Sequence, residues 1–180
     1  MPVYKVIHIS KNPLFCEGKK YHDDTALYAV SNYIMADRVN YFVSINGFGV
    51  DLRNPALSMD MVAKAYGKDS GLRLRHSVLS FSDNEVSQLA STLEDQLEVI
   101  DRIAWFSGEY YGREYQMIYG IHPEKGHIHV HYMMSTLNYN TGLKYDGKKS
   151  DYYAYKRFLN DFFQEFFGWY VIFVQDKLID

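Results

Sequence analysis

The sequence predicts an α/β sandwich, with a largely antiparallel central sheet of about five strands flanked by helices. Short apolar segments typical of strands alternate with long amphipathic segments typical of helices. The segments 115–121 and 127–137 are separated by a turn that contains proline and glycine, which indicates an antiparallel hairpin. No repeat, low-complexity tract or flexible linker interrupts the chain, so residues 1–180 are expected to form one domain.

In the first half of the chain we expect three strands and two helices. A strand over 4–10 is followed by a helix over 25–36, with Asp23 or Asp24 as its N-cap. A second strand, over 41–50, is interrupted by glycines. Asn54 and Pro55 mark the start of a short helix, because proline is tolerated in the first turn. Residues 72–81 alternate as a strand does.

In the second half, Ser82 and Glu85 form a capping box that begins a helix. The apolar stripe of that helix consists of Val86, Leu89, Leu93, Leu97, Ile100 and Ala104. The hairpin follows, and then a helix over 151–167 and a closing strand over 169–174. The last helix is expected to bury Phe158, Leu159, Phe162 and Phe166.

The composition excludes several classes of protein. Hydrophobic residues make up 47% of the chain and aromatic residues 17%, which excludes disorder for most of it. The single cysteine, Cys16, excludes an intramolecular disulfide and a cysteine-based zinc cluster. No signal peptide and no apolar run of about 20 residues is present, so we expect a cytoplasmic protein without membrane insertion.

The charge distribution is more informative than the net charge of -3, which by itself argues weakly against a nucleic-acid-binding protein. Basic residues cluster after the histidine-rich segment, and two more lie on an earlier strand. The candidate DNA-binding residues are Arg73, Arg75, Lys144, Lys148, Lys149 and Arg157.

The histidine-rich strand carries the strongest functional signal. Alternate side chains of a strand share a face, so His127, His129 and His131 point one way, while Ile128 and Val130 point into the core. Packing alone does not explain three aligned imidazoles, whereas neutral imidazole is the commonest metal ligand.

Two residues before this strand extend the site. His122, at the end of the preceding strand, can approach the same ion across the tight turn. Glu124, in the turn, is a candidate carboxylate for orienting an imidazole. The pattern therefore predicts a metal site.

The segment from His122 to His131, followed by Asn138 and by Thr141-Gly142-Leu143-Lys144, resembles the third motif of mobilisation relaxases. These are HUH endonucleases, and the likeness is to the MobA/MobL and MobP-like branch. The segment 75–81 with Glu85 resembles the family's middle strand and helix start, and the segment 27–34 resembles its first motif. The resemblance implies an RRM/ferredoxin-like relaxase fold.

The resemblance implies metal ligands at His122, His129 and His131, with His127 as an accessory residue. A register shifted by two residues would instead pair His127 with His129. The ion would be Mg²⁺ or Mn²⁺, with Zn²⁺ also compatible with histidine ligands.

The nucleophile of the family maps best onto Tyr33. On the helix over 25–36 the apolar stripe is Leu27, Val30 and Ile34, and Tyr33 flanks it. Tyr28 lies about 140° around the helix from Tyr33, so the two cannot face one site. Tyr28, Tyr21 and His22 remain alternatives.

The activity that the resemblance implies is nicking and religation of single-stranded DNA at an origin of transfer, through a covalent 5′-phosphotyrosyl intermediate. Accessory mobilisation proteins and a coupling protein are the implied partners. Glu124 replaces the family's usual aspartate, and Ser135 stands where asparagine is common. Two alternatives stay open. One is a histidine-triad nucleotide hydrolase or phosphoramidase, and the other is an HUH replication initiator or transposase.

Overall fold

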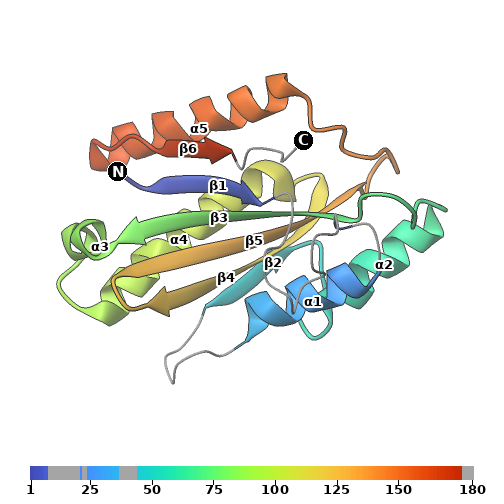
Figure 1. The fold of residues 1–180 in the computed structure, drawn as a ribbon, viewed down its shortest axis with the longest axis horizontal. Coiled ribbons are helices and arrows are strands. Elements are labelled where there is room, and N and C mark those ends of the chain that lie inside the picture. The colour runs from blue at the N-terminus through green and yellow to red at the C-terminus, as the bar shows by residue number, and fades with distance from the viewer. Residues whose placement is uncertain (8–20, 22–23, 37–43, 176–180) are drawn as a thin grey trace.

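The computed structural model describes residues 1–7, 21, 24–36 and 44–175. Their centre is a six-stranded sheet of order β2-β4-β5-β3-β1-β6, with helices on both faces (Figure 1). Neighbouring strands are antiparallel except β1 and β6, which are parallel. The predicted largely antiparallel α/β architecture is confirmed. The six strands correspond to the six segments predicted as strands, so the expected total of about five was one too low.

The strands are β1 (Val3–Ile7), β2 (Ile45–Phe48), β3 (Leu74–Ser82), β4 (Tyr115–Glu124), β5 (His127–Asn138) and β6 (Ile172–Gln175). The helices are α1 (Asp24–Met35), α2 (Pro55–Ala65), α3 (Asp83–Leu89), α4 (Leu93–Gly112) and α5 (Lys149–Phe167). Predicted residues 8–10 and 41–43, and the possible N-cap Asp23, lie outside the described part of the chain.

The hairpin of β4 and β5 is longer than predicted and sets the register of the histidines. Strand β4 continues past residue 121 as far as Glu124, and only Lys125 and Gly126 form the turn. Gly126 has a φ of +90°, which favours glycine over other residues. The register places His122 directly opposite His129, and Gly120 opposite His131.

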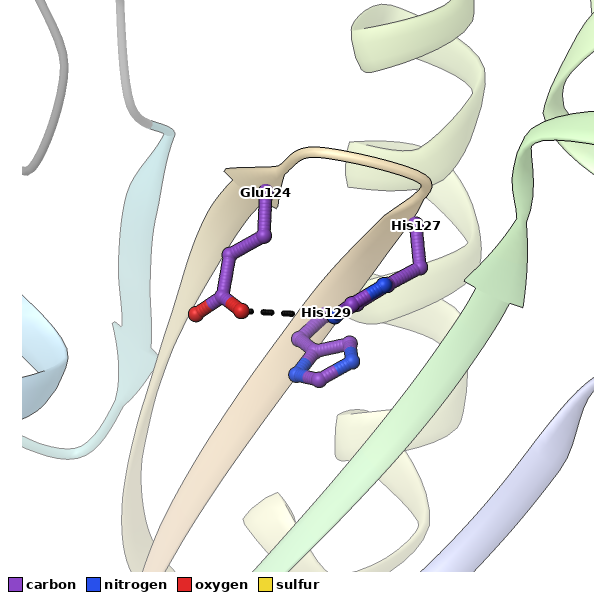
Figure 2. Close-up of side chains that lie close together, drawn as sticks. All are labelled: Glu124, His127 and His129. Carbon is purple, nitrogen blue, oxygen red and sulfur yellow. Dashed lines mark ion pairs between the residues drawn. The ribbon is translucent and has the colours of Figure 1, made fainter.

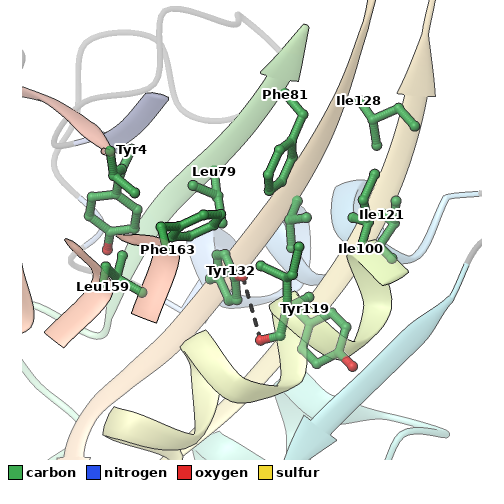
Figure 3. Packing of buried hydrophobic residues seen from close by; sticks show 14 of the residues in the cluster. Tyr4, Leu79, Phe81, Ile100, Tyr119, Ile121, Ile128, Tyr132, Leu159 and Phe163 are labelled. Carbon is green, nitrogen blue, oxygen red and sulfur yellow. Dashed lines mark hydrogen bonds between the residues drawn. The ribbon is translucent and has the colours of Figure 1, made fainter. Parts of the chain in front are cut away.

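The sheet buries a different hydrophobic core on each face. Helices α3, α4 and α5 cover one face, where Leu79, Phe81 and Val130 are buried with aromatic residues of α5 (Figure 3). Helices α1 and α2 cover part of the other face, where Leu27 and Ile34 pack on a smaller set of sheet residues. Consecutive residues of β5 contribute to opposite faces, as its alternation predicts.

Two details of the helices differ from the prediction. The helix expected after Ser82 is divided in two, because Thr92 caps a second helix by accepting a hydrogen bond from the amide of Asp95. Leu93 therefore lies at a helix start, 39% exposed, instead of in the apolar stripe.

In α5 the buried residues are Tyr155, Leu159 and Phe163, spaced by four. Phe158 and Phe162 lie beside this stripe, partly buried, and Phe166 lies off it and is 65% exposed, so its predicted burial is wrong. The capping box of Ser82 and Glu85 is confirmed. The short helix predicted after Asn54 and Pro55 is also confirmed, and the side chain of Asn54 caps it by accepting from the amide of Leu57.

Candidate functional site

The histidine face is the face of the sheet that α1 and α2 cover. On β5, His127, His129 and His131 point to this face, while Ile128 and Val130 are buried in the opposite core. The predicted separation of the two sets is thus confirmed. Burial of the histidines increases along β5, since His127 and His129 are partly exposed and His131 is only 4% exposed.

His122 is fully buried and is held by the end of α1. Its Nε2 lies 2.9 Å from the backbone carbonyl oxygen of Ile34. A carbonyl only accepts hydrogen bonds, so Nε2 carries the proton and donates. When the imidazole binds a metal ion, Nδ1 is therefore the nitrogen that can supply the lone pair.

Gly120 allows α1 to approach the sheet at this point. A Cβ atom on Gly120 would lie 2.5 Å from the carbonyl oxygen of Ile34, which is closer than real contacts allow. Glycine therefore lets the same carbonyl reach His122, two residues further along β4. The main chain beside Tyr33 is fixed to the histidine strand by this contact.

Tyr33 lies among the histidines. Its ring centroid is 5.1 Å from that of His131, 5.4 Å from that of His122 and 6.3 Å from that of His76, in edge-on arrangements. Leu27, Val30 and Ile34 are buried on the stripe that the sequence predicts, and Tyr33 flanks it, half-buried. The structure thus brings the first candidate nucleophile to two of the candidate metal ligands.

The other candidate nucleophiles occupy different places. Tyr28 is exposed on the same helix. Tyr21 is buried, and its hydroxyl lies 3.4 Å from Nδ1 of His76. His22 lies outside the described residues.

His76, on β3, is a member of the site that the sequence analysis did not single out. Its Nε2 lies 3.1 Å from Nδ1 of His131. Burial, together with the nearby His122, lowers the pKa of His76 to about 4, so its imidazole is neutral at physiological pH. The signal that could have identified it is its place in the strand, two positions after Leu74 and therefore on the same face as an apolar residue.

A second group of potential ligands lies at the tip of the hairpin. Nε2 of His127 lies 3.3 Å from a carboxylate oxygen of Glu124, and the rings of His127 and His129 are stacked with centroids 4.2 Å apart (Figure 2). One ligand-type atom from each of these three residues lies within 4.8 Å of the others. Glu124 therefore contacts an imidazole, as an orienting carboxylate would.

His129 belongs to two sets of candidate ligands. The first set consists of His122, His129 and His131, and the second, at the tip of the hairpin, consists of Glu124, His127 and His129. Burial lowers its pKa, and so does neighbouring His127. A neutral imidazole is the form that binds metal.

Among the described residues, ligand atoms within 4.8 Å of one another are found in the hairpin-tip set and not in the set of His122, His129 and His131. In the first set, the ring centroid of His131 lies 4.7 Å from that of His122 and 5.8 Å from that of His129. The second set consists of the tip residues Glu124, His127 and His129, whose ligand atoms lie close together. The donor chemistry of both sets suits a divalent cation.

The basic residues proposed from the sequence do not form one group beside the histidines. Arg73 is buried in ion pairs with Asp60 and Asp24, so it is part of the internal packing and not of a DNA-binding surface. Arg75 lies on the opposite face of the sheet, against the ring of Tyr145. The ammonium of Lys144 donates to the carbonyl of Ser70, at the other end of β5 from the hairpin.

The remaining three basic residues lie on or next to α5, which covers the opposite face of the sheet. Lys148 is exposed and pairs with Asp146, and Lys149 and Arg157 are exposed on the helix itself. Among the described helices, none is long and apolar enough to cross a membrane.

Comparison with known proteins gives two matches. The family described as relaxase, MobA/VirD2-like, nuclease domain, matches residues 28–166, a range that includes Tyr33 and every histidine from His76 to His131. The chain is also similar to a structure solved in work on the molecular basis of vancomycin resistance transfer in Staphylococcus aureus. The TM-score is 0.52 at 12% identity, over 84% of this chain and 91% of that chain, which is a likeness of fold. No curated protein matches the sequence.

Proposed function

Because the chain belongs to the MobA/VirD2-like nuclease family of relaxases and is thus a DNA-nicking enzyme, we propose that Tyr33 is its nucleophile. The proposed reaction is strand- and site-specific nicking of single-stranded DNA at an origin of transfer, followed by religation. The observation that carries the proposal is the packing of the Tyr33 ring against His122 and His131. Membership of this family also removes the reason for the histidine-triad and replication-initiator alternatives.

The phenol oxygen of Tyr33 attacks the phosphorus of the scissile phosphodiester, the bond to the 3′ oxygen of the preceding nucleotide breaks, and a 5′-phosphotyrosyl link forms. The phenolic proton leaves as the bond forms, and the departing 3′ oxygen gains a proton to become a hydroxyl. Reversal of the same exchange religates the strand.

We propose that His122, His129 and His131 hold a divalent cation, with His127 and Glu124 as accessory residues. The support is their position, since His122 and His131 adjoin Tyr33, whereas Glu124 lies at the exposed tip of the hairpin. Three neutral imidazoles leave the charge of the ion intact, and the ion would polarise the scissile phosphate. Mg²⁺ or Mn²⁺ is the proposed cofactor, with Zn²⁺ compatible with the same ligands.

The residues of the chain have separate tasks in this proposal. The hydrogen bond from His122 to Ile34 fixes one metal ligand and the end of the helix that carries the nucleophile. The contact between His76 and His131 holds a second ligand in one orientation. Pre-arranged positions of this kind lower the entropic cost of bringing the hydroxyl to the phosphate.

The test uses single-stranded DNA that spans the origin of transfer of the chain's own mobile element, with Mn²⁺. We expect a covalent protein–DNA adduct on a denaturing gel for the wild type and for Tyr28→Phe, which is the matched control on the same helix. Tyr33→Phe should give no adduct. An adduct that persists in Tyr33→Phe and disappears in Tyr21→Phe or His22→Ala would transfer the role to that residue.

A further inference from the structure

A cavity on the face of the sheet opposite the histidine-rich strand's imidazoles is lined by two cationic side chains and several tyrosines. It has a volume of about 130 Å³ and lies between β1, β3 and the beginning of α5. Its lining includes Arg75, Lys149 and the rings of Tyr4, Tyr111, Tyr145 and Tyr152. None of the described residues in the lining is a carboxylate, and Arg75 and Lys149 give the cavity a positive charge.

Arg75 is the unusual residue of this cavity. Its guanidinium lies over the ring of Tyr145, 4.7 Å from the centroid, and against the backbone of Gly147. Its Nε atom is buried and makes no hydrogen bond, and no carboxylate pairs with Arg75 among the residues that the structure describes. A guanidinium held in the protein without a counter-ion is costly, so an anion bound beside Arg75 in the cavity would supply the missing negative charge.

The surroundings define the kind of anion. Lys149 is the first residue of α5, so the positive end of this helix dipole adds to the potential of Arg75. The volume corresponds to roughly four water molecules, which is enough for a phosphate group but not for a drug-sized molecule. Guanidinium groups bind phosphate oxygens through paired N–H donors.

An adjoining hollow provides space for the rest of a nucleotide. It has a volume of about 550 Å³ and shares Tyr111 and Tyr145 with the cavity. Its lining includes Glu114, Asp146 and Asp151, whose negative charges repel a phosphate. The phosphate therefore belongs beside Arg75, while a base can stack on a tyrosine ring and extend into the hollow.

We propose that this cavity binds one nucleotide unit, with its phosphate on Arg75 and its base against the tyrosine rings. The identity of the ligand rests on the proposed action on single-stranded DNA. The site lies on the other face of the sheet from Tyr33, so it would hold DNA away from the nick. Binding there requires neither the metal nor the nucleophile.

The test measures the anisotropy of a labelled single-stranded oligonucleotide in the presence of EDTA, which separates binding from nicking. We expect Arg75→Gln to weaken binding about tenfold or more, because hydrogen bonds to a charged group are lost. The exposed Lys149→Gln should weaken it about threefold. The matched control is Arg102→Gln, at an exposed position of α4, which removes the same charge and should change binding less than twofold.

The Arg75 Nε–H resonance in an ¹H–¹⁵N spectrum identifies the ligand directly. A saturable shift with inorganic phosphate and with a deoxynucleoside monophosphate, but not with the nucleoside, supports a phosphate site that accepts free nucleotides. A shift with the oligonucleotide alone supports the same site within a DNA strand.

Absence of a shift with all of these probes would overturn the proposal, as would equal weakening by Arg102→Gln. Either result would leave nicking by Tyr33 untouched. Conversely, if the nicking assay gave no adduct, the shift of the Arg75 resonance would still decide whether the cavity binds phosphate.

Discussion

The two faces of the sheet are built from the same strands but differ in how they are covered. Helices α4 and α5, of 20 and 19 residues, cover one face, so Ile128 and Val130 of β5 are buried near the hairpin. The histidine face has only α1 and α2, of 12 and 11 residues. Helix α1 ends at Met35, beside His122, and the hairpin residues beyond this point are partly exposed.

The helices are also held by different forces on the two faces. On the face covered by α4 and α5, aromatic packing between the two helices dominates, for example the stacking of Phe106 on Phe158 and Phe162. On the histidine face a charge cluster joins the elements, because buried Arg73 pairs with the partly exposed Asp24 of α1 and with the buried Asp60 of α2. One strand can therefore serve both stability and chemistry, provided that the helices stop covering it where the chemistry begins.

The largest expected effect comes from substituting, one at a time, two neighbouring residues of β5 that point to opposite faces of the sheet. His129→Ala should lower the nicking rate about 1000-fold or more, since a metal contribution of several kcal/mol is lost. Its effect on the free energy of unfolding should stay below about 1 kcal/mol, because His129 is partly exposed.

Ile128→Ala is the matched substitution on the other face, and we expect it to lower the free energy of unfolding by about 2–5 kcal/mol. Urea unfolding and the adduct assay measure the two quantities. Similar losses of stability in both variants would contradict the division between the faces.

The charge cluster under α2 should make the histidine face sensitive to acid. Asp60→Asn should destabilise the protein by about 3 kcal/mol, because it leaves Arg73 buried with a weakened set of partners. Burial alone would raise the pKa of Asp60, but its contacts with Lys64 and Arg73 outweigh this and lower it.

The folded-state pKa is therefore below the unfolded value of about 3.9. The stabilisation is present above pH 4 and is lost as the pH falls through the folded-state pKa. Unfolding measured from pH 6 to pH 2 should show a steeper loss in the wild type than in Asp60→Asn. Parallel curves would show that Asp60 does not contribute.

A smaller effect is expected where α1 meets the sheet. Gly120→Ala places a methyl group against the carbonyl of Ile34 and should displace the end of α1 that carries Tyr33. Misplacement of a reacting group by about 1 Å can lower a rate about 100-fold, so we expect adduct formation to slow by up to that factor.

Binding of DNA in EDTA should remain unchanged in Gly120→Ala, which serves as its internal control. Wild-type rates of adduct formation in this variant would show that the contact with Ile34 does not position Tyr33.

Much of the architecture could be predicted from the sequence, because local patterns of apolar and polar residues indicate the strands, the helices and their buried faces. The alternation of His127 to Tyr132 gave the two faces of β5, and the stripe Leu27, Val30 and Ile34 placed Tyr33 at the edge of the core. The division between α3 and α4 was missed, since the apolar spacing continues through Leu93 and only the Thr92 cap interrupts it.

The environment of single side chains could not be predicted in the same way. Arg73 and Arg75 look alike in the sequence, yet one is buried between α1 and α2 and the other lies on the opposite face. Their surroundings depend on residues distant in the chain, Asp60 and Tyr145. For the same reason the role of His76 was not recognised, because its partner His131 is 55 positions away.

The smallest effect is expected from His76 itself, and it tests whether the histidine face is organised beyond its ligands. Partners that orient a metal-binding histidine typically contribute 10–100-fold to affinity. His76→Ala should therefore weaken Mn²⁺ binding about tenfold in calorimetric titration, and the ¹⁵N shifts of His131 should show a mixture of tautomers. The matched control is Ser77→Ala, whose side chain points to the other face, near Tyr4. If Ser77→Ala weakened binding as much, or if His76→Ala left both the affinity and the His131 tautomer unchanged, the contact would be packing alone.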